Sequence, residues 1–311
     1  TNKFRRKIVE ILEQIDILMQ NLIANPKSDL VLKMFKKISP GKKLRSKLIL
    51  NIAGINEKSL NLCAIIELIH CASLLHDDVI DESDTRRGNP SINAIFGAKS
   101  AIMLGDALYS KGFFELCKFD NFIASCVSDA VAKLSIGELM DVNLSQNFSA
   151  NLDAYKDMIY LKTAVLIEAC GKVAAKLTGA DDEICAKFGE YGKNLGIAFQ
   201  IIDDILDITQ NSISLGKPAM NDYKEGKTTL PYIYLYRVLD KADKEKLKSF
   251  YKKSLNHDEI LWLRTKFDEY NIIARAKNEA KDYGTKALQS IKDFKNEKLE
   301  NIVKTMIYRD F

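Results

Sequence analysis

The stretch LCAIIELIHCASLLHDDVIDESDTRRG, from Leu62 to Gly88, decides how the chain folds. Its first 14 residues are apolar with almost no polar break, which is typical of a helix near the centre of a helical bundle. Its second part places three aspartates, Asp77, Asp78 and Asp81, within five residues. Two like charges about 4 Å apart cost about 1 kcal/mol in water and about 4 kcal/mol near a protein surface. We therefore expect something cationic to offset this charge.

Apolar residues recur at helical spacing along the whole chain. Only 5 prolines and 15 glycines interrupt the 311 residues, no segment alternates convincingly like a strand, and no linker rich in Gly, Ser or Pro separates domains. The sequence therefore predicts an all-α fold in which residues 1–311 form a single domain, built as one large helical bundle. We expect helices over residues 3–24, 28–37, 42–54, 58–83, 91–95, 98–118, 120–143, 151–177, 181–210, 228–238, 241–254, 257–269, 271–291 and 296–308.

The composition excludes several kinds of partner and site. The net charge is +4 with both signs interspersed, and no basic stripe is interleaved with aromatic residues, so no nucleic-acid partner is expected. No run of about 18 or more apolar residues occurs, and the N-terminal residues have amphipathic helical spacing, so neither a membrane span nor a signal peptide is expected. The six cysteines form no CxxC pair, which indicates buried thiols in a reducing, cytoplasmic location rather than a zinc site or disulfides.

A second acidic cluster repeats the spacing of the first. The stretch GIAFQIIDDILDITQ places Asp203, Asp204 and Asp207 at the end of another apolar helix. By chance, one DDxxD is expected in roughly 0.06 of chains of this size and two in roughly 0.002. Residues four apart share a helix face, so Asp77 with Asp81, and Asp203 with Asp207, can direct oxygens to one point. A few hard oxygen ligands suit Mg²⁺ that is shared with a substrate phosphate, so we expect two acidic faces bridged by metal ions and a diphosphate.

A diphosphate is itself anionic, so its site also needs cationic side chains. Arginine pairs bidentately with phosphate oxygens, and lysine acts as a compact charge. The chain offers these candidates: Lys42, Lys43, Arg45, Arg86, Arg87, Lys162 beside Thr163, Lys217 and Lys227. Each of them alone would be read as a surface charge, but their joint occurrence with both acidic clusters indicates a diphosphate site.

Together these motifs resemble those of the trans-isoprenyl diphosphate synthases, the polyprenyl synthetase family. The resemblance covers nearly the whole chain. It is carried by GKKLR at 41–45, IELIHCASLLHDDVIDESDTRRG, the GD at 105–106, LKTA at 161–164, GIAFQIIDDILD and GKPAMNDYKEGKTTLP. It implies an all-α protein, usually a homodimer, with a deep central cavity where isopentenyl diphosphate is added head to tail to an allylic diphosphate.

The resemblance also implies roles for matching residues. Mg²⁺ ions, about three per active site, would bind together with the allylic diphosphate at Asp77, Asp78, Asp81, Asp203, Asp204 and Asp207. The allylic diphosphate would also contact Arg86, Lys162, Gln200 and Lys217, with Thr163 close by. Isopentenyl diphosphate would be held by Lys42, Arg45, His70 and Arg87, and Lys227 would add positive charge at the mouth. Two positions depart from the pattern: the family often has Arg where Lys43 stands and Pro where Ser46 stands, and the second puts the order of the local loop in question.

The implied reaction ionises the allylic C–O bond, so charge develops on the leaving diphosphate. The residues expected to stabilise that charge are Asp77, Asp78, Asp81, Arg86, Lys162, Asp203, Asp204 and Lys217. The diphosphate itself is a plausible acceptor for the proton that is then lost, so no side-chain base need be sought. We expect His70 to bind diphosphate and His76 to have a structural role.

Product length in this family depends partly on the residues one helical turn before the first acidic motif. Here Ala72 and Ser73 are both small, and the motif lacks the longer insertion of bacterial farnesyl diphosphate synthases. Both features resemble synthases that make quinone side chains, so we expect octaprenyl diphosphate, within a range from hexa- to decaprenyl, made from farnesyl diphosphate. The floor of the cavity would lie deeper, with Leu108, Phe113, Phe114 and Met140 as unranked candidates.

Three other readings stay open. A short-chain synthase that makes farnesyl or geranylgeranyl diphosphate would share every catalytic residue. A terpene cyclase would lack the second DDxxD and the GKKLR-type site. A non-catalytic scaffold would show degraded aspartates, and none is degraded here.

Overall fold

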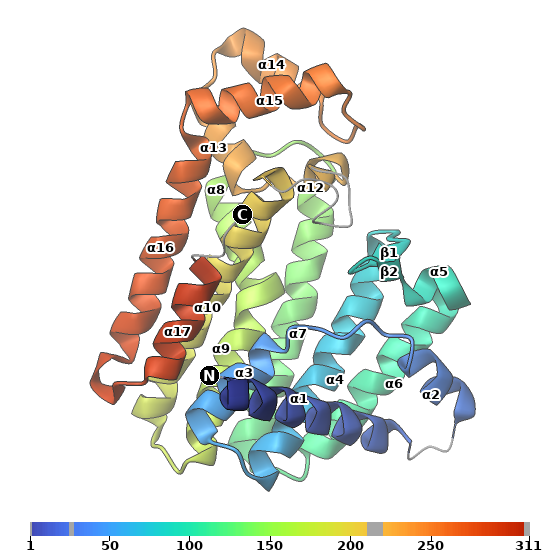
Figure 1. Cartoon of the computed structure of the whole chain (residues 1–311). Helices are drawn as coiled ribbons and strands as arrows, with labels where there is room; N and C mark the ends of the chain where they lie inside the picture. The colour runs from blue at the N-terminus through green and yellow to red at the C-terminus, as the bar shows by residue number, and fades with distance from the viewer. Residues whose placement is uncertain (1, 25–27, 210–219, 308–311) are drawn as a thin grey trace. The chain divides into compact units, whose positions relative to one another are not determined.

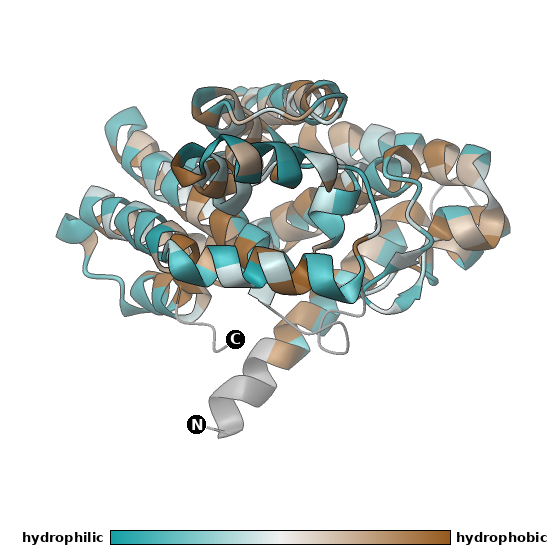
Figure 2. Ribbon diagram, turned by 90° about the horizontal axis from the view of Figure 1, so that it is seen from above, coloured by the Kyte–Doolittle hydropathy of each residue, from teal (hydrophilic) through white to brown (hydrophobic). Residues whose placement is uncertain are grey.

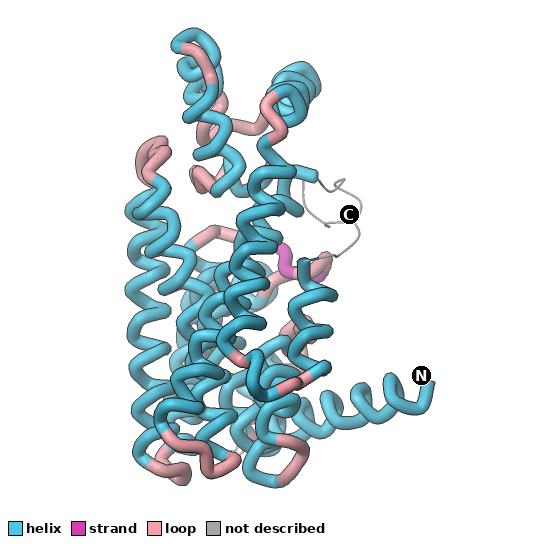
Figure 3. Tube along the Cα trace, turned by 90° about the vertical axis from the view of Figure 1, so that its left-hand side faces the viewer, coloured by secondary structure: helices cyan, strands magenta, loops and turns pink. Residues whose placement is uncertain are grey.

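The computed structural model describes residues 2–24, 28–209 and 220–307 (Figure 1). This part of the chain is almost entirely helical, which confirms the predicted all-α class (Figure 3). The chain divides into two compact units, Thr1–Val131 with Ala169–Ala186, and Ala132–Glu168 with Lys187–Phe311. The unit boundaries fall inside three helices, so α7, α9 and α10 each contribute a part to both units.

The first unit is built around α4 (Glu57–Ile80), the helix that carries the apolar run. Asn56 and Ser59 form a reciprocal capping box at its start, which satisfies two of the free N–H groups there. Residues such as Leu62, Ile66 and Leu68 are fully buried, and α4 packs against α1, α3, α5 and α6. The other elements of this unit are α1 (Asn2–Ile23), α2 (Asp29–Phe35), α3 (Leu44–Ala53), β1 (Thr85–Arg86), β2 (Asn89–Pro90), α5 (Ile92–Phe96), α6 (Ala98–Leu116), and parts of α7 (Asn121–Leu144), α9 (Val165–Leu177) and α10 (Asp182–Thr209).

The second unit has its own aromatic core. Tyr223 and Tyr232 stack with ring centroids 4.1 Å apart, and Phe267 meets Tyr232 edge-on at 5.4 Å. Most helices in Figure 2 carry both hydrophobic and hydrophilic residues, as amphipathic helices around a core do. Besides the remaining parts of α7, α9 and α10, its elements are α8 (Leu152–Ile159), a π-helix (Tyr160–Ala164), α12 (Asn221–Lys224), α13 (Leu230–Val238), α14 (Lys241–Ser249), α15 (His257–Glu269), α16 (Ile272–Ser290), a 3₁₀-helix (Lys292–Phe294) and α17 (Glu297–Ile307).

The structure differs from the sequence prediction at several places, including the helix predicted over 241–254, which ends at Ser249. A two-residue antiparallel strand pair, β1 with β2, lies where no strand was expected. The helix predicted over 58–83 ends at Ile80. The helix predicted over 151–177 contains a π-helical turn, and the short helix α12 lies in a stretch that was expected to be irregular.

The structure bears on two further expectations, those for membrane spans and for the cysteines. Within the described ranges, α4 alone is long and apolar enough to cross a membrane, and 67% of its most apolar window is buried inside the chain, as in the core helix of a bundle. All six cysteines are free thiols. Cys63, Cys170 and Cys185 are buried as expected, but Cys117 is exposed, because it caps the end of α6.

Candidate active site

The first acidic motif lies where α4 ends. Asp77 and Asp78 belong to its last turn, and Asp81 is the residue that caps it, with its backbone N–H donating to the Asp77 carbonyl at 2.8 Å. Asp78 is buried, whereas Asp77 and Asp81 are half-buried. The third aspartate therefore lies at the exit of the helix rather than inside it.

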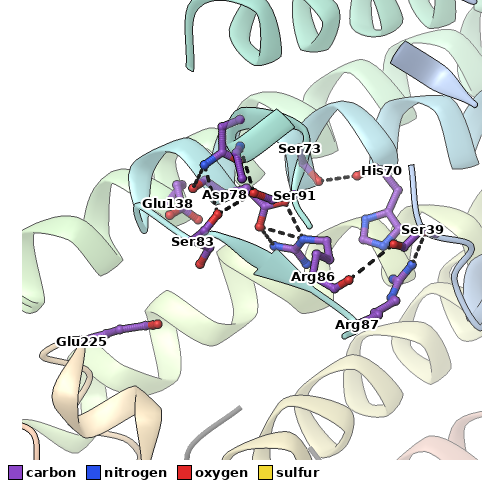
Figure 4. A network of polar contacts seen from close by, with 12 residues as sticks. Ser39, His70, Ser73, Asp78, Ser83, Arg86, Arg87, Ser91, Glu138 and Glu225 are labelled. Carbon is purple, nitrogen blue, oxygen red and sulfur yellow. Dashed lines mark hydrogen bonds and ion pairs between the residues drawn. The ribbon is translucent and has the colours of Figure 1, made fainter. Parts of the chain in front are cut away.

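Asp78 is held by an arginine of the strand pair that follows (Figure 4). The Arg86 Nε lies 2.8 Å from both carboxylate oxygens, and the Arg86 Nη2 lies 2.6 Å from Oδ1. A fork of this kind is the strong form of a charge-assisted hydrogen bond. The cation expected from the sequence is thus supplied, for Asp78, by the chain itself.

The strand pair fixes Arg87 in an unusual backbone conformation. Arg87 and Gly88 form its two-residue turn, with φ values of 54° and 76°. Positive φ at both positions is what a type I′ hairpin turn requires, and a non-glycine residue there is strained by about 1–3 kcal/mol. The guanidinium of Arg87 donates to the Ser39 carbonyl at 2.9 Å and lies against Gly41, where an added Cβ would be 3.1 Å away. Arg87 is therefore held against the segment that leads into α3.

Three residues expected to hold isopentenyl diphosphate interact electrostatically in this unit. Burial lowers the pKa of His70 well below its usual value, and the positive charges of Arg45, Arg87 and Arg86 lower it further, so the imidazole is neutral. The Nδ1 of His70 and the Nε of Arg45 are buried and have no hydrogen-bond partner among the described residues. Unpaired buried polar groups beside arginines fit an anionic ligand.

The neighbouring lysines differ from each other. Lys42 is exposed. Lys43 is buried, and its ammonium donates to the Leu12 carbonyl at 3.1 Å and pairs with Asp16 of α1. Lys43 therefore fastens the start of α3 to α1 rather than facing a ligand.

The residues expected to influence product length are buried in α4. Ala72 is fully buried and Ser73 is 5% exposed, with the Ser73 hydroxyl donating to the His70 carbonyl at 2.9 Å. Of the candidates for a cavity floor, Leu108 is fully buried. Phe114 is 61% exposed, and its ring contacts the ammonium groups of Lys111 and Lys118. The prediction that Phe114 forms a buried cavity floor within this chain was therefore wrong.

His76 has a structural environment. Its Nε2 lies 3.1 Å from the Ile102 carbonyl and 3.4 Å from Asp106, and its ring contacts Tyr109. Only a glycine at position 105 leaves room for the His76 ring, because a Cβ there would be 2.3 Å from the His76 Nε2. The GD pair at 105–106 thus locks the end of α4 onto α6, and His76 is a packing residue rather than a base.

The second acidic motif, at the end of α10, is held by neutral donors. Asp204 is buried and accepts hydrogen bonds from the Tyr155 hydroxyl and from the Gln200 amide at 2.9 Å. Gln200 in turn accepts from the Thr163 hydroxyl at 2.8 Å. Asp207 accepts from the backbone N–H groups of Asn221 and Asp222 at 3.1 and 3.2 Å. Three residues expected at the diphosphate, Thr163, Gln200 and Asp204, are therefore connected in one hydrogen-bond chain.

This unit also shows why a cation fits there. Burial, and then the negative charge of Asp222, raise the pKa of both Asp204 and Asp207 to about 8. A divalent cation beside these carboxylates would stabilise their ionised forms. Across residues 2–24, 28–209 and 220–307, no three acidic, His or Cys side chains are already arranged to hold a metal on their own.

Lys162 and Thr163 lie in the π-helical turn Tyr160–Ala164. The Lys162 ammonium pairs with Asp141 and lies 3.0 Å from Glu138, both on α7. The backbone of α7 approaches this turn so closely that a Cβ on Gly137 would be 2.3 Å from the backbone nitrogen of Lys162. Single π-helical turns are frequent at functional sites, and here the turn aligns Lys162 with its two carboxylates.

Lys227 lines a small pocket. Lys217 lies outside the described residues. The Lys227 ammonium is 2.8 Å from Glu225. The pocket is lined by Asp141, Leu144, Ser145, Ser149, Asn151, Tyr155, Met158, Gly226, Lys227, Thr228 and Thr229.

Several polar residues that interact with the predicted site residues were not predicted from the sequence. Asp222 lies inside the quoted stretch GKPAMNDYKEGKTTLP. Its negative charge raises the pKa of Asp204 and so distinguishes the electrostatic surroundings of the second motif from those of the first. Glu138 and Asp141 are three residues apart, which places both on one helix face, and that spacing could have signalled a shared partner. Tyr155 gives no signal, because its partner Asp204 is 49 residues away.

The chain is similar to known proteins over most of its length. The sequence profile of the family described as polyprenyl synthetase matches residues 28–263. Solanesyl-diphosphate synthase 2, chloroplastic, of Oryza sativa subsp. japonica is 33% identical over 287 residues, which cover 86% of this chain and 70% of that protein. Octaprenyl diphosphate synthase of Haemophilus influenzae is 36% identical over 240 residues, covering 75% of this chain and 71% of the relative.

A similar solved structure extends the match to almost the full length. The crystal structure of octaprenyl pyrophosphate synthase from Helicobacter pylori superposes with a TM-score of 0.90 at 44% sequence identity. The match covers 96% of this chain and 98% of that one.

Proposed function

This chain belongs to the polyprenyl synthetase family, and from that premise we propose that it is a trans-prenyltransferase that condenses isopentenyl diphosphate with an allylic diphosphate to give a medium- or long-chain polyprenyl diphosphate. The most specific product we propose is octaprenyl diphosphate, made from farnesyl diphosphate for a quinone side chain. The observation that carries the reaction is that the two aspartate motifs occur undegraded, together with Arg45, Arg86 and Arg87, in one chain of this family.

Each set of residues has a task that follows from its contacts. Arg45 and Arg87, beside the neutral His70, supply positive charge and unpaired donors for isopentenyl diphosphate. Arg86 holds Asp78 in one orientation, and Gln200 with Tyr155 does the same for Asp204. Lys162, aligned by Glu138 and Asp141, places a compact cation for the leaving diphosphate.

We propose Mg²⁺ as the required ion, because carboxylates in small number with oxygen donors only are its usual protein ligands. When bound, it would stabilise charge on the departing diphosphate. Its protein ligands would come from the two acidic motifs, as the family resemblance implies: Asp77, Asp78, Asp81, Asp203, Asp204 and Asp207. The family resemblance also supports a homodimer and a cytoplasmic location as proposals.

The test is a turnover assay on the full chain. Purified protein with Mg²⁺, labelled isopentenyl diphosphate and farnesyl diphosphate should give a ladder of extracted products that ends near octaprenyl. An Asp77→Asn variant should abolish incorporation, while Asp258→Asn, an exposed carboxylate on α15, should not change it. No incorporation with farnesyl, geranyl or dimethylallyl primers would reject the proposed reaction.

Product length is tested separately. Ala72 and Ser73 are small and buried one turn before Asp77, so a phenylalanine at either position should fill space that a growing chain would otherwise enter. We expect Ala72→Phe and Ser73→Phe to shorten the product, measured by chromatography of the dephosphorylated alcohols. Wild-type protein that stops at geranylgeranyl would favour the short-chain reading, and unchanged length in both variants would reject the role of these two positions.

A further inference from the structure

The helix that carries Arg45 begins without a cap of its own. α3 starts after Lys43, which has a left-handed backbone (φ 49°) and makes no side-chain hydrogen bond to the first turn. In most helices a Ser, Thr, Asp or Asn at that position accepts a hydrogen bond from the second or third N–H group. The third N–H of α3 belongs to Ser46, and it is not satisfied from within its own helix.

A buried carboxylate of α4 takes over this role. The Oε1 of Glu67 accepts from the Ser46 backbone N–H at 3.3 Å and from the Ser46 hydroxyl at 2.6 Å. Ser46 is fully buried and Glu67 is 5% exposed, so water does not compete for either bond. Glu67 therefore caps α3 from the neighbouring helix, with two hydrogen bonds to one residue.

Ser46 is one of the two positions that depart from the family pattern. A proline at position 46 would have neither an N–H nor a hydroxyl to give to Glu67. The serine provides both, so two hydrogen bonds fasten α3 to α4 at this position. These bonds hold Ser46 in the first turn of α3, next to the loop whose order was put in question.

The fastening lies next to the residues that would bind isopentenyl diphosphate. Arg45 directly precedes Ser46, and His70 lies one turn after Glu67 on α4. Glu67 is also among the negative charges that favour the charged form of Arg45. Holding Ser46 thus fixes the start of α3 at the point where Arg45 leaves the backbone.

We propose that Glu67 and Ser46 are positioning residues for isopentenyl diphosphate: Glu67 caps α3 through Ser46 and so fixes where Arg45 presents its guanidinium. The inference rests on the proposed function, and it concerns one of the two substrates only. Removing the fastening should therefore weaken the use of isopentenyl diphosphate and leave the use of the allylic substrate nearly unchanged.

The experiment measures KM for both substrates in the full-length protein. Glu67→Met, which removes the acceptor at similar length, should raise the KM for isopentenyl diphosphate about tenfold, the loss typical of groups that orient a ligand-binding residue. Ser46→Ala keeps the backbone N–H and should raise it about threefold. In both variants the KM for farnesyl diphosphate should stay within about twofold of wild type, and Ser46→Thr, which restores a hydroxyl, should recover most of the loss.

A matched control separates positioning from stability. Ser59 is another fully buried serine, and its hydroxyl donates to the Gly54 carbonyl at 2.8 Å at the opposite end of α3. Ser59→Ala should lower the melting temperature as Ser46→Ala does, without changing either KM. Equal changes in both KM values, or no change in the KM for isopentenyl diphosphate, would overturn the inference while wild-type turnover upholds the proposed function. Absence of wild-type turnover would instead reject the proposed function, and the inference with it.

Discussion

The two DDxxD motifs have the same spacing but opposite electrostatic surroundings. In the first, the buried Asp78 is neutralised by the fork of Arg86. In the second, the buried Asp204 is bonded by Tyr155 and Gln200, which are neutral, and Asp222 adds negative charge. The first motif therefore carries a cation of its own at its middle aspartate, whereas the surroundings of the second favour binding a cation from solution.

This difference shows that two motifs with the same spacing can hold their aspartates in different ways, one by an ion pair and the other by neutral hydrogen-bond donors. An internal ion pair fixes geometry whether or not substrate is bound, and losing one partner of it is costly because a charge remains buried. Neutral donors fix geometry too, but they leave the charge of the carboxylate available for a metal ion. We therefore expect mutations around the first motif to act mainly through stability and orientation, and mutations around the second to act mainly through Mg²⁺.

The largest effect is expected from breaking the ion pair of the first motif. Arg86→Met leaves Asp78 buried without its partner, which should lower the free energy of unfolding by about 3 kcal/mol, the low end for buried pairs because Arg86 is partly exposed. It also removes a cation near the developing charge, which should lower kcat by about 100-fold. Denaturant unfolding and turnover assays measure the two effects.

A double variant separates these two consequences. Asp78→Asn combined with Arg86→Met removes both charges, so most of the lost stability should return, while turnover should stay low. Recovery of activity together with stability would mean that Arg86 acts only as a structural partner, and the comparison between the motifs would lose its basis.

The sequence predicted the helices well because their apolar periodicity repeats over many residues. It was wrong about the end of α4, since periodicity does not show that the chain turns away at Asp81 into a two-residue strand pair with Arg87 at positive φ. Strands of two residues are too short to alternate. The π-helical turn at Lys162 was also missed, because one extra residue per turn barely disturbs the apolar pattern.

For the site, the residue types and spacings of the two motifs were enough to select the aspartates. Their partners could not be selected in the same way. Tyr155 and Asp222 reach Asp204 and Asp207 through tertiary contacts, and nothing in the local sequence marks them. What the sequence identifies is the set of charges, and what the structure adds is which charges are already neutralised.

A smaller effect is expected from Tyr155→Phe at the second motif. The variant removes one neutral donor to Asp204, so we expect a loss of about 1 kcal/mol in the free energy of unfolding and about a tenfold lower turnover. Tyr223→Phe is the matched control, since its hydroxyl is also buried in this unit and donates to the Leu247 carbonyl at 2.8 Å. That control should lose similar stability and keep its turnover; an equal fall in turnover for both tyrosines would show that Tyr155 has no special role.

The smallest effect, and the sharpest for the comparison, is expected from Asp222→Asn. The backbone N–H to Asp207 stays in place, and a negative charge is removed from beside Asp204 and Asp207. Without Mg²⁺, less like-charge repulsion should raise the free energy of unfolding by about 1 kcal/mol, and the Mg²⁺ concentration for half-maximal turnover should rise about fivefold. Asp258→Asn on α15 changes the net charge equally and should alter neither quantity. Stability and Mg²⁺ affinity should therefore move in opposite senses at Asp222, and if both fall together, the second motif is a structural cluster like the first rather than one that depends on an external cation.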